Sequence, residues 1–182
     1  MIISMFTYSD YGDRVAGILA LDGAGSRLMP LACGTCSSPQ AYQLLKNSSS
    51  RQLFPASRAP EAAMAGLWLY FSCLDEAHSV AQSVETADGS FWHAIMHRQE
   101  PDAGNAGYWF RRVGKHAVFP ALREAALLLG YRCGTAWDPF AFIDDCEQAR
   151  REPGSERELL MQRVQLAEWQ LLFHHCARPD VQ

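Results

Sequence analysis

Residues 65–82 read AGLWLYFSCLDEAHSVAQ and carry the clearest structural signal in the chain. Its first half is apolar on nearly all sides, which suits a helix buried among several neighbours. In its second half Ala77 and Val80 begin a narrow apolar stripe that continues to Val84, which predicts an amphipathic helix over residues 75–84. A tight turn is all that separates the two helices. The stretch therefore predicts an αα-hairpin.

This hairpin resembles one helix-turn-helix unit of the tetratricopeptide type, with small residues where the helices cross. A second, looser copy is expected further along the chain, where Gly104-Asn105-Ala106 matches Asp75-Glu76-Ala77 at the end of a hairpin. The two copies lie 29 residues apart, whereas that repeat has a period of about 34, and two units are fewer than a solenoid requires. We therefore expect tetratricopeptide-like hairpins in the middle of the chain and no extended solenoid.

Three helix starts are marked by capping residues. Ser38 and Asp138 each precede a proline, and this order favours the start of a helix. The side-chain oxygen of the capping residue accepts a backbone N–H of the first turn that has no partner within the helix, and proline has no N–H that would need one. Ser155 with Glu158 has the spacing of a capping box. It opens a last helix that reaches residue 176, carries apolar residues on more than one side, and is therefore expected to cross the bundle.

The N-terminal third has the weakest patterns, and two interpretations of it stay open. Residues 10–20 have the apolar spacing of an amphipathic helix, but a β-hairpin of residues 16–21 with 27–32 is the alternative, because short apolar runs are ambiguous. We expect about eight helices in all. No shift of composition along the chain marks a boundary between two domains. The prediction is a single all-α domain over residues 1–182, a helical bundle in which residues 1–58 are the least defined.

Composition excludes several classes of protein. With 182 residues, 48% of them hydrophobic and 20% charged, the chain is long enough to bury a core of its own. It has no apolar run of the roughly 18 residues that span a bilayer, and residues 1–10 lack the pattern of a secretory signal, so we expect a cytoplasmic protein without a membrane partner. The net charge of −4 and the absence of a basic cluster argue against nucleic acid. No glycine-rich nucleotide loop is present.

The six cysteines are expected to be reduced thiols, because a cytoplasmic protein with its own core needs no disulfide framework. Cys33 and Cys36 form a CxxC pair. The pair has neither the preceding strand of a redox motif nor the second ligand pair of a zinc site, so we interpret it as incidental.

Chemically capable side chains are densest in FWHAIMHRQEPDAGNAGYWFRRVGKHAVF, residues 91–119. At about 100° per residue, Trp92, Ile95 and Met96 share one helix face, and His93, His97 and Glu100 share the next. A second helix over residues 105–113 is expected to bury Trp109 and to leave its polar side chains beside that stripe. The candidate cluster or pocket comprises His93, His97, Arg98, Glu100, Asp102, Tyr108, Arg111, Arg112 and His116.

Within this segment, W-H-x-I-x-H-R-x-E-P-D-x-x-N-A-x-Y-W-x-R-R-V-G-x-H, residues 92–116, resembles a motif of an uncharacterised family of soluble helical proteins. The likeness extends more weakly from the helix at Pro60 to the C-terminus and covers residues 1–58 poorly. The family has no established activity, so the resemblance implies membership and assigns no catalytic residue.

Three functions fit this cluster, and the first is structural. The histidines and acids would pair with Arg98, Arg111 and Arg112 in a polar network that joins two helices. The protein would then be an interaction scaffold for a protein partner, a common use of stacked helical hairpins.

The second interpretation is a metal site, with zinc as the cofactor. His93 and His97 have the HxxxH spacing by which two imidazoles on one helix face reach one ion, and Glu100 could be a third ligand, with His116 or Asp102 as alternatives. An open position on the ion would activate water for hydrolysis. Ala94 stands where the HExxH pattern has its glutamate base.

The third interpretation is a metal-free pocket for a small molecule. Arg98, Arg111 and Arg112 would bind a carboxylate or phosphate, completed by Tyr108 and His97. His93 or His97 would then act as acid or base.

Overall fold

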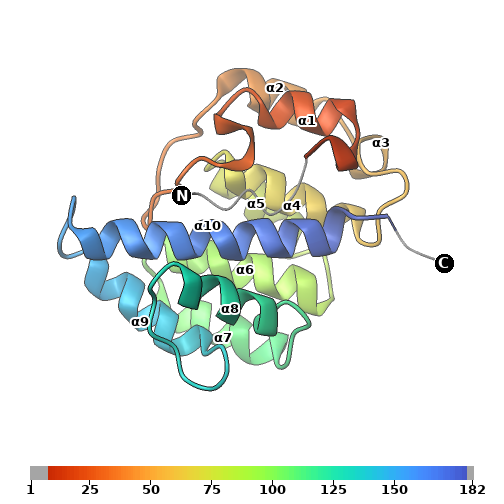
Figure 1. The fold of residues 1–182 in the computed structure, drawn as a ribbon. Coiled ribbons are helices and arrows are strands. Elements are labelled where there is room, and N and C mark those ends of the chain that lie inside the picture. Colours follow the sequence, from red (N-terminus) through yellow and green to blue (C-terminus); the bar gives the residue numbers. More distant parts are fainter. Residues whose placement is uncertain (1–7, 180–182) are drawn as a thin grey trace.

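The computed structural model describes residues 8–179 and is built from helices (Figure 1). These residues form ten α-helices and two short 3-10 turns, and the one extended pairing among them is an isolated bridge between Ser57 and Pro179. The helices are α1 (Asp13–Leu19), α2 (Pro39–Lys46), α3 (Ser50–Leu53), α4 (Pro60–Tyr70), α5 (Leu74–Ala81), α6 (Ala87–Gln99), α7 (Ala103–Val113), α8 (Phe119–Leu128), α9 (Pro139–Ala149) and α10 (Glu156–Ala177).

The all-α prediction is confirmed, with ten helices in the described residues where about eight were expected. The short helix α3 was not among the helices predicted, because four residues are too few to show an apolar repeat. Ser49 opens α3 through a capping box with Gln52. In the N-terminal third the helical interpretation holds and the β-hairpin is wrong, since α1 is followed by a 3-10 turn at Gly23–Gly25.

The three predicted helix starts are present. The Ser38 hydroxyl accepts the amide of Ala41, and the Asp138 carboxylate accepts two amides at the start of α9. Ser155 Oγ accepts the amide of Glu158, but the Glu158 carboxylate accepts the amide of Gly154 and not that of Ser155. The sequence therefore located these helices by the hydrogen bonds that their first turns require.

Helix α6 begins one turn earlier than its hydrophobic pattern indicated. The apolar stripe recognised in the sequence begins at Trp92, but Thr86 caps the helix by accepting the amide of Gly89. This extra turn places Asp88 on the helix, where its side chain is almost fully buried. The pattern missed it because a buried acid interrupts the apolar periodicity.

Helix α10 crosses the whole molecule, as its two-sided apolar pattern predicted. In Figure 1 it runs between α1 and α2 on one side and α8 and α9 on the other. It packs against α4, α8 and α9. None of the helices in residues 8–179 is long and apolar enough to cross a membrane.

Helices α4, α6 and α10 meet closely at Gly66. A Cβ atom at this position would lie 2.7 Å from Cζ2 of Trp92, so no larger residue fits without displacing the indole. The carbonyl of Gly66 accepts the Nε1 proton of Trp169 at 2.8 Å, which joins α4 to α10. The rings of Trp92 and Phe173 therefore leave no room for a side chain at position 66.

A buried ion pair joins α6 to α10. The Arg98 guanidinium contacts both carboxylate oxygens of Glu168, and both side chains are fully buried. Burial alone lowers the pKa of Arg98, but Glu168 outweighs it and the pKa lies above its ordinary value. The face of Arg98 lies over the Phe142 ring at 4.6 Å, so α9 joins the same contact.

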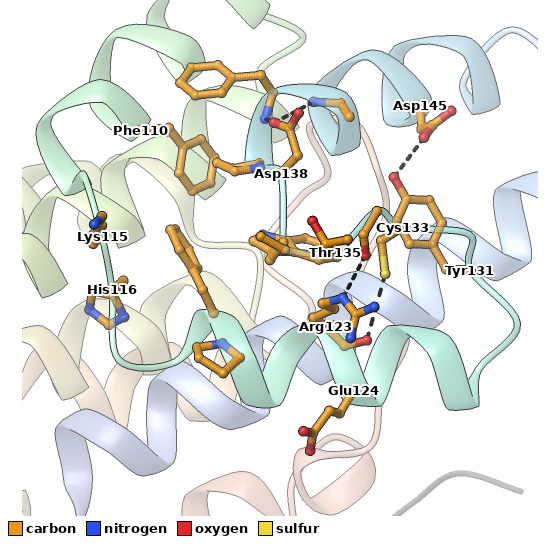
Figure 2. Close-up of a pocket in the computed structure, with 18 of the residues that line it drawn as sticks. Phe110, Lys115, His116, Arg123, Glu124, Tyr131, Cys133, Thr135, Asp138 and Asp145 are labelled. Carbon is orange, nitrogen blue, oxygen red and sulfur yellow. Dashed lines mark hydrogen bonds between the residues drawn. The ribbon is translucent and has the colours of Figure 1, made fainter.

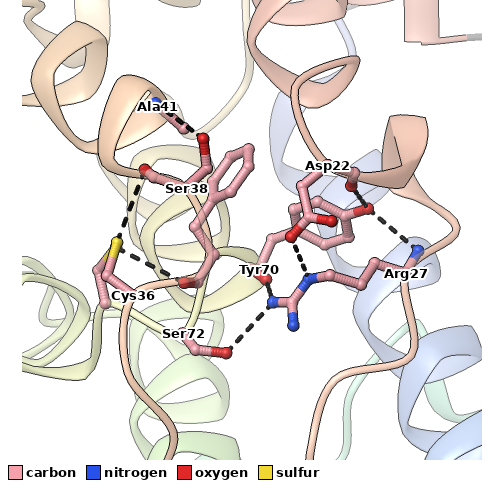
Figure 3. Close-up of a disulfide and its surroundings, with 9 residues drawn as sticks. Asp22, Arg27, Cys36, Ser38, Ala41, Tyr70 and Ser72 are labelled. Carbon is pink, nitrogen blue, oxygen red and sulfur yellow. Dashed lines mark hydrogen bonds and ion pairs between the residues drawn. A yellow bond between two sulfur atoms is a disulfide. The ribbon is translucent and has the colours of Figure 1, made fainter.

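The segment between α1 and α2 is tied to the hairpin α4–α5 by a disulfide between Cys36 and Cys73 (Figure 3). The expectation that all six cysteines are reduced is therefore wrong for this pair. Sequence could not reveal it, because the partners are 37 residues apart and only the fold brings their Cα atoms to 4.6 Å. Nearby, Arg27 bonds to Asp22 and to the carbonyl of Tyr70. The other four cysteines are free thiols.

We predict that Trp92→Ala lowers the free energy of unfolding by about 3–5 kcal/mol, because a fully buried indole leaves a cavity that α4 and α10 cannot fill. Urea denaturation followed by circular dichroism measures this change. Trp109 was predicted to be equally buried but is only half-buried. Trp109→Ala is therefore expected to cost less, and equal losses would contradict the packing described.

We also predict that Glu168→Leu alone lowers the free energy of unfolding by about 3–5 kcal/mol, because it leaves the Arg98 charge buried without a partner. Arg98→Met combined with Glu168→Leu is expected to recover most of this loss, since two apolar side chains carry no desolvation penalty. Urea denaturation of both single variants and the double variant completes the cycle. Additive losses would contradict a coupled pair.

Candidate metal centre

Three imidazoles meet where α5 lies against α6. His78 comes from α5, and His93 and His97 come from successive turns of α6. One ring nitrogen of each lies within 4.8 Å of the other two. The HxxxH pair on α6 was recognised in the sequence, and the third histidine comes from the α4–α5 hairpin.

Ring stacking fixes the orientation of the central histidine. The His93 ring stacks on Trp109 of α7 with a centroid distance of 3.9 Å and on His97 at 4.9 Å. The His78 ring meets His93 edge to face at 4.7 Å. Helices α5, α6 and α7 therefore hold the cluster from three sides.

The environment of His93 keeps its imidazole neutral. The side chain is 3% exposed, and its buried Nδ1 has no hydrogen-bond partner among residues 8–179. Burial, reinforced by the nearby His97 and His78, lowers the pKa of His93 to about 4. At neutral pH this residue thus offers a lone pair and no charge, which is the state that binds a metal.

Glu100 lies at the edge of the cluster, at the end of α6. Its Oε2 is 2.9 Å from Nδ1 of His97. The two atoms lie at ion-pair distance without the geometry of a hydrogen bond, and acids beside metal-binding histidines commonly act as outer partners of this kind. Glu100, predicted as a third ligand, is not part of the group that meets within 4.8 Å, and His78 takes that place.

The structure separates Arg98 and Asp102 from this site. Arg98 is committed to Glu168 in the core, so it does not converge with Arg111 and Arg112 on a shared anion. Asp102 caps α7 by accepting the backbone and side-chain amides of Asn105. These hydrogen bonds are the main reason that the pKa of Asp102 lies below its ordinary value.

The remaining predicted residues of α7 face outward. Tyr108 is 47% exposed, and Arg111 and Arg112 are also exposed. The Arg112 guanidinium lies 5.1 Å from the centre of the Trp109 ring, on whose indole His93 is also stacked. Arg112 therefore contacts the edge of the histidine cluster without entering it.

His116 belongs to a second cluster, with Asp88 and His175. Its Nε2 donates to Asp88 at 3.0 Å, and its Nδ1 accepts the amide of Val118. The Arg58 guanidinium also bonds to Asp88 at 2.6 Å. Although burial raises the pKa of Asp88, the two histidines and Arg58 lower it well below its ordinary value. A guanidinium already neutralises this carboxylate, so the second cluster is a polar network.

Sequence reasoning missed His78 as a site residue. It lies on the polar side of an amphipathic helix, and no spacing relates it to residues 93 and 97. A weak signal was available, because the predicted hairpin and the segment at residues 91–119 are neighbours in the chain, and neighbouring helical hairpins pack together. It would not have singled out this histidine.

Comparisons with protein-family models, with curated proteins and with solved structures give no match to this chain. The resemblance of residues 92–116 to a family motif and the tetratricopeptide-like character of the hairpins therefore stay predictions.

We predict that metal-free protein loses stability as the pH falls from about 6.5 to about 4, partly through His93. In this window the unfolded chain binds a proton at the residue and the folded chain does not, so stability falls with pH. His93→Gln removes this difference and is expected to reduce the loss by about 1–3 kcal/mol. Urea denaturation at pH 7 and 4.5 measures it, and equal losses in both proteins would contradict a depressed pKa.

Proposed function

We propose that this protein binds a divalent transition-metal ion, of the zinc type, through His78, His93 and His97. One observation carries the proposal. A nitrogen from each imidazole lies within 4.8 Å of the other two, and the buried Nδ1 of His93 has no partner among the described residues. A buried polar atom without a partner costs free energy, and a bound ion would offset that cost at the same point.

The donor set favours zinc over magnesium or calcium. Imidazole nitrogens suit zinc, copper and nickel, whereas magnesium and calcium require oxygen ligands. The group contains no acid, and the Glu100 carboxylate is paired with His97 at its edge. It would act as the outer partner that orients a ligand histidine.

Three protein ligands would leave one tetrahedral position for water, as in catalytic zinc sites and unlike closed structural ones. His78 and His97 are only partly buried, so that position is accessible from solvent. A water bound there would be activated for hydrolysis, and hydrolysis is the class of reaction that such a site would support.

We predict that untagged protein purified without chelator contains about one equivalent of metal by elemental mass spectrometry. His78→Gln and His93→Gln are each expected to lower this content at least tenfold, since each removes one of three ligands. Zinc added to metal-free wild type is expected to raise the melting temperature, because the ion binds the folded state. The increase should shrink as the pH is lowered, because protons compete with the ion for the ligand nitrogens.

His175→Gln is the matched control, because it removes a histidine from the second cluster and leaves the first intact. Its metal content should equal that of the wild type. If His175→Gln lost its metal while His93→Gln kept it, the ion would be assigned to the Asp88 cluster, and the proposal would be contradicted.

An interaction scaffold is the second candidate function. It is favoured by the packing of hairpin α4–α5 against hairpin α6–α7, with the histidines and Trp109 stacked between them. If the protein is a scaffold, His97→Ala lowers the free energy of unfolding and leaves metal binding unchanged. If the cluster is a metal site, the same variant loses metal binding, and the free energy of unfolding of the metal-free protein changes little.

A further inference from the structure

A pocket on the other side of α7 is separate from the histidine cluster. It lies between α7, α8 and α9, is bordered by the loops that join them, and has a volume of about 1070 Å³ (Figure 2). This volume is sufficient for a molecule of the size of a typical cofactor or drug. None of the three clustered histidines lines it.

Aromatic rings make up much of the wall. Phe110, Phe119, Trp137 and Phe140 line the pocket, one or more from each of the surrounding segments. Phe140 is 41% exposed although it is a large apolar side chain. Flat apolar surfaces of this kind bind flat apolar molecules by stacking and edge contacts.

The charges that are free to bind a ligand are mostly positive. Arg111, Lys115, Arg123 and Arg132 all line the pocket. Arg123 uses Nε to bond the carbonyl of Gly134, and within residues 8–179 its terminal nitrogens make no further hydrogen bond. A guanidinium with two free nitrogens is suited to a carboxylate, phosphate or sulfonate.

The acids of the pocket are largely committed elsewhere. Asp138 accepts two amides at the start of α9, and Asp145 accepts bonds from Tyr131 and Arg157. In Figure 2 the Glu124 side chain points away from the centre of the pocket, whereas Arg123, on the same helix, points toward it. Four basic and three acidic side chains line the pocket, and Asp145 is already paired with Arg157, so positive charge predominates around a ligand.

Trp137 adds a donor that lacks an acceptor. Its side chain is 6% exposed, and its Nε1 has no hydrogen-bond partner among the described residues. Buried indole N–H groups usually have a partner, because leaving one unpaired costs free energy. Trp137 lines the pocket, so a ligand oxygen that reaches this buried atom would supply the acceptor.

We propose that this pocket binds a small aromatic acid, a flat apolar molecule that carries one anionic group. The rings contact its body, Arg123 and Lys115 hold its charge, and Trp137 Nε1 donates to one of its oxygens. His116 also lines the pocket, but Asp88 and Val118 occupy both of its nitrogens. The site therefore binds its ligand without a histidine acid or base.

The experiment uses a matched pair of fluorescent probes. 1-Anilinonaphthalene-8-sulfonate is a flat aromatic anion, and N-phenyl-1-naphthylamine has the same rings without the charge. Fluorescence titration gives both affinities, and the melting temperature shows whether the anion binds the folded state, since binding to unfolded chain would lower it. We expect the wild type to bind the sulfonate at least fivefold more tightly than the neutral probe, with a rise in melting temperature.

Three variants separate the contributions. Arg123→Gln with Lys115→Gln is expected to weaken the sulfonate at least fivefold and to leave the neutral probe unchanged. Trp137→Phe keeps a ring and removes the donor, so it should weaken the sulfonate more than the neutral probe. The control Arg51→Gln removes a positive charge that is 81% exposed on α3, away from the pocket, and should change neither affinity.

Three outcomes would overturn the proposal. The first is no saturable binding of the sulfonate, or binding that lowers the melting temperature. The second is that the wild type binds the two probes with equal affinity and that the double variant Arg123→Gln with Lys115→Gln does the same. The third is an equal loss in Arg51→Gln, which would mean that net charge and not this pocket attracts the anion. Metal content plays no part in these readouts, so this test and that of the metal site fail independently.

Discussion

Helices α6 and α10 are joined through one buried ion pair, Arg98 with Glu168. Two opposite charges that are fully buried tolerate little separation, because either one alone would carry a large desolvation penalty. The pair therefore fixes α6 against α10. It also organises its surroundings: Gln165, which contacts Arg98, donates to the carbonyls of Met29 and Pro30, and Arg150 donates to those of Leu31 and Arg98. The irregular segment before α2 is held by these bonds and by the disulfide.

Different faces of helix α6 carry the ion pair and the histidine cluster. Consecutive residues on an α-helix point about 100° apart. Since Arg98 is directed to α10, the preceding His97 is directed to another face, where α5 and α7 approach. The rigid attachment on one face holds the histidines on the other in position, which is what a preorganised ligand set requires. The half-buried Trp109 completes that face by stacking on His93.

Both clusters contain histidines, but the second also contains the carboxylate of Asp88 and the guanidinium of Arg58. In the Asp88 cluster Arg58 satisfies the carboxylate, so every charge has a partner and an ion would compete with a guanidinium. In the other cluster three imidazoles meet without a cation or an acid inside the group, and burial keeps His93 neutral. Geometric proximity alone would rate the two equally, and the local charge balance favours only one of them as a metal centre.

The helical class, the starts of several helices and two of the three clustered histidines were predictable from the amino-acid sequence. These features depend on local hydrogen bonds and on apolar spacing, as Ser38, Asp138 and the HxxxH pair show. The early start of α6 and the short α3 were missed because caps and a buried acid, without apolar periodicity, define them. The contacts between distant residues became visible only in the folded structure. Arg98 and His116 are not part of the histidine cluster as predicted, His78 is part of it, and Cys36 pairs with Cys73. Such pairings depend on how segments far apart in the chain pack together, and no local spacing encodes that.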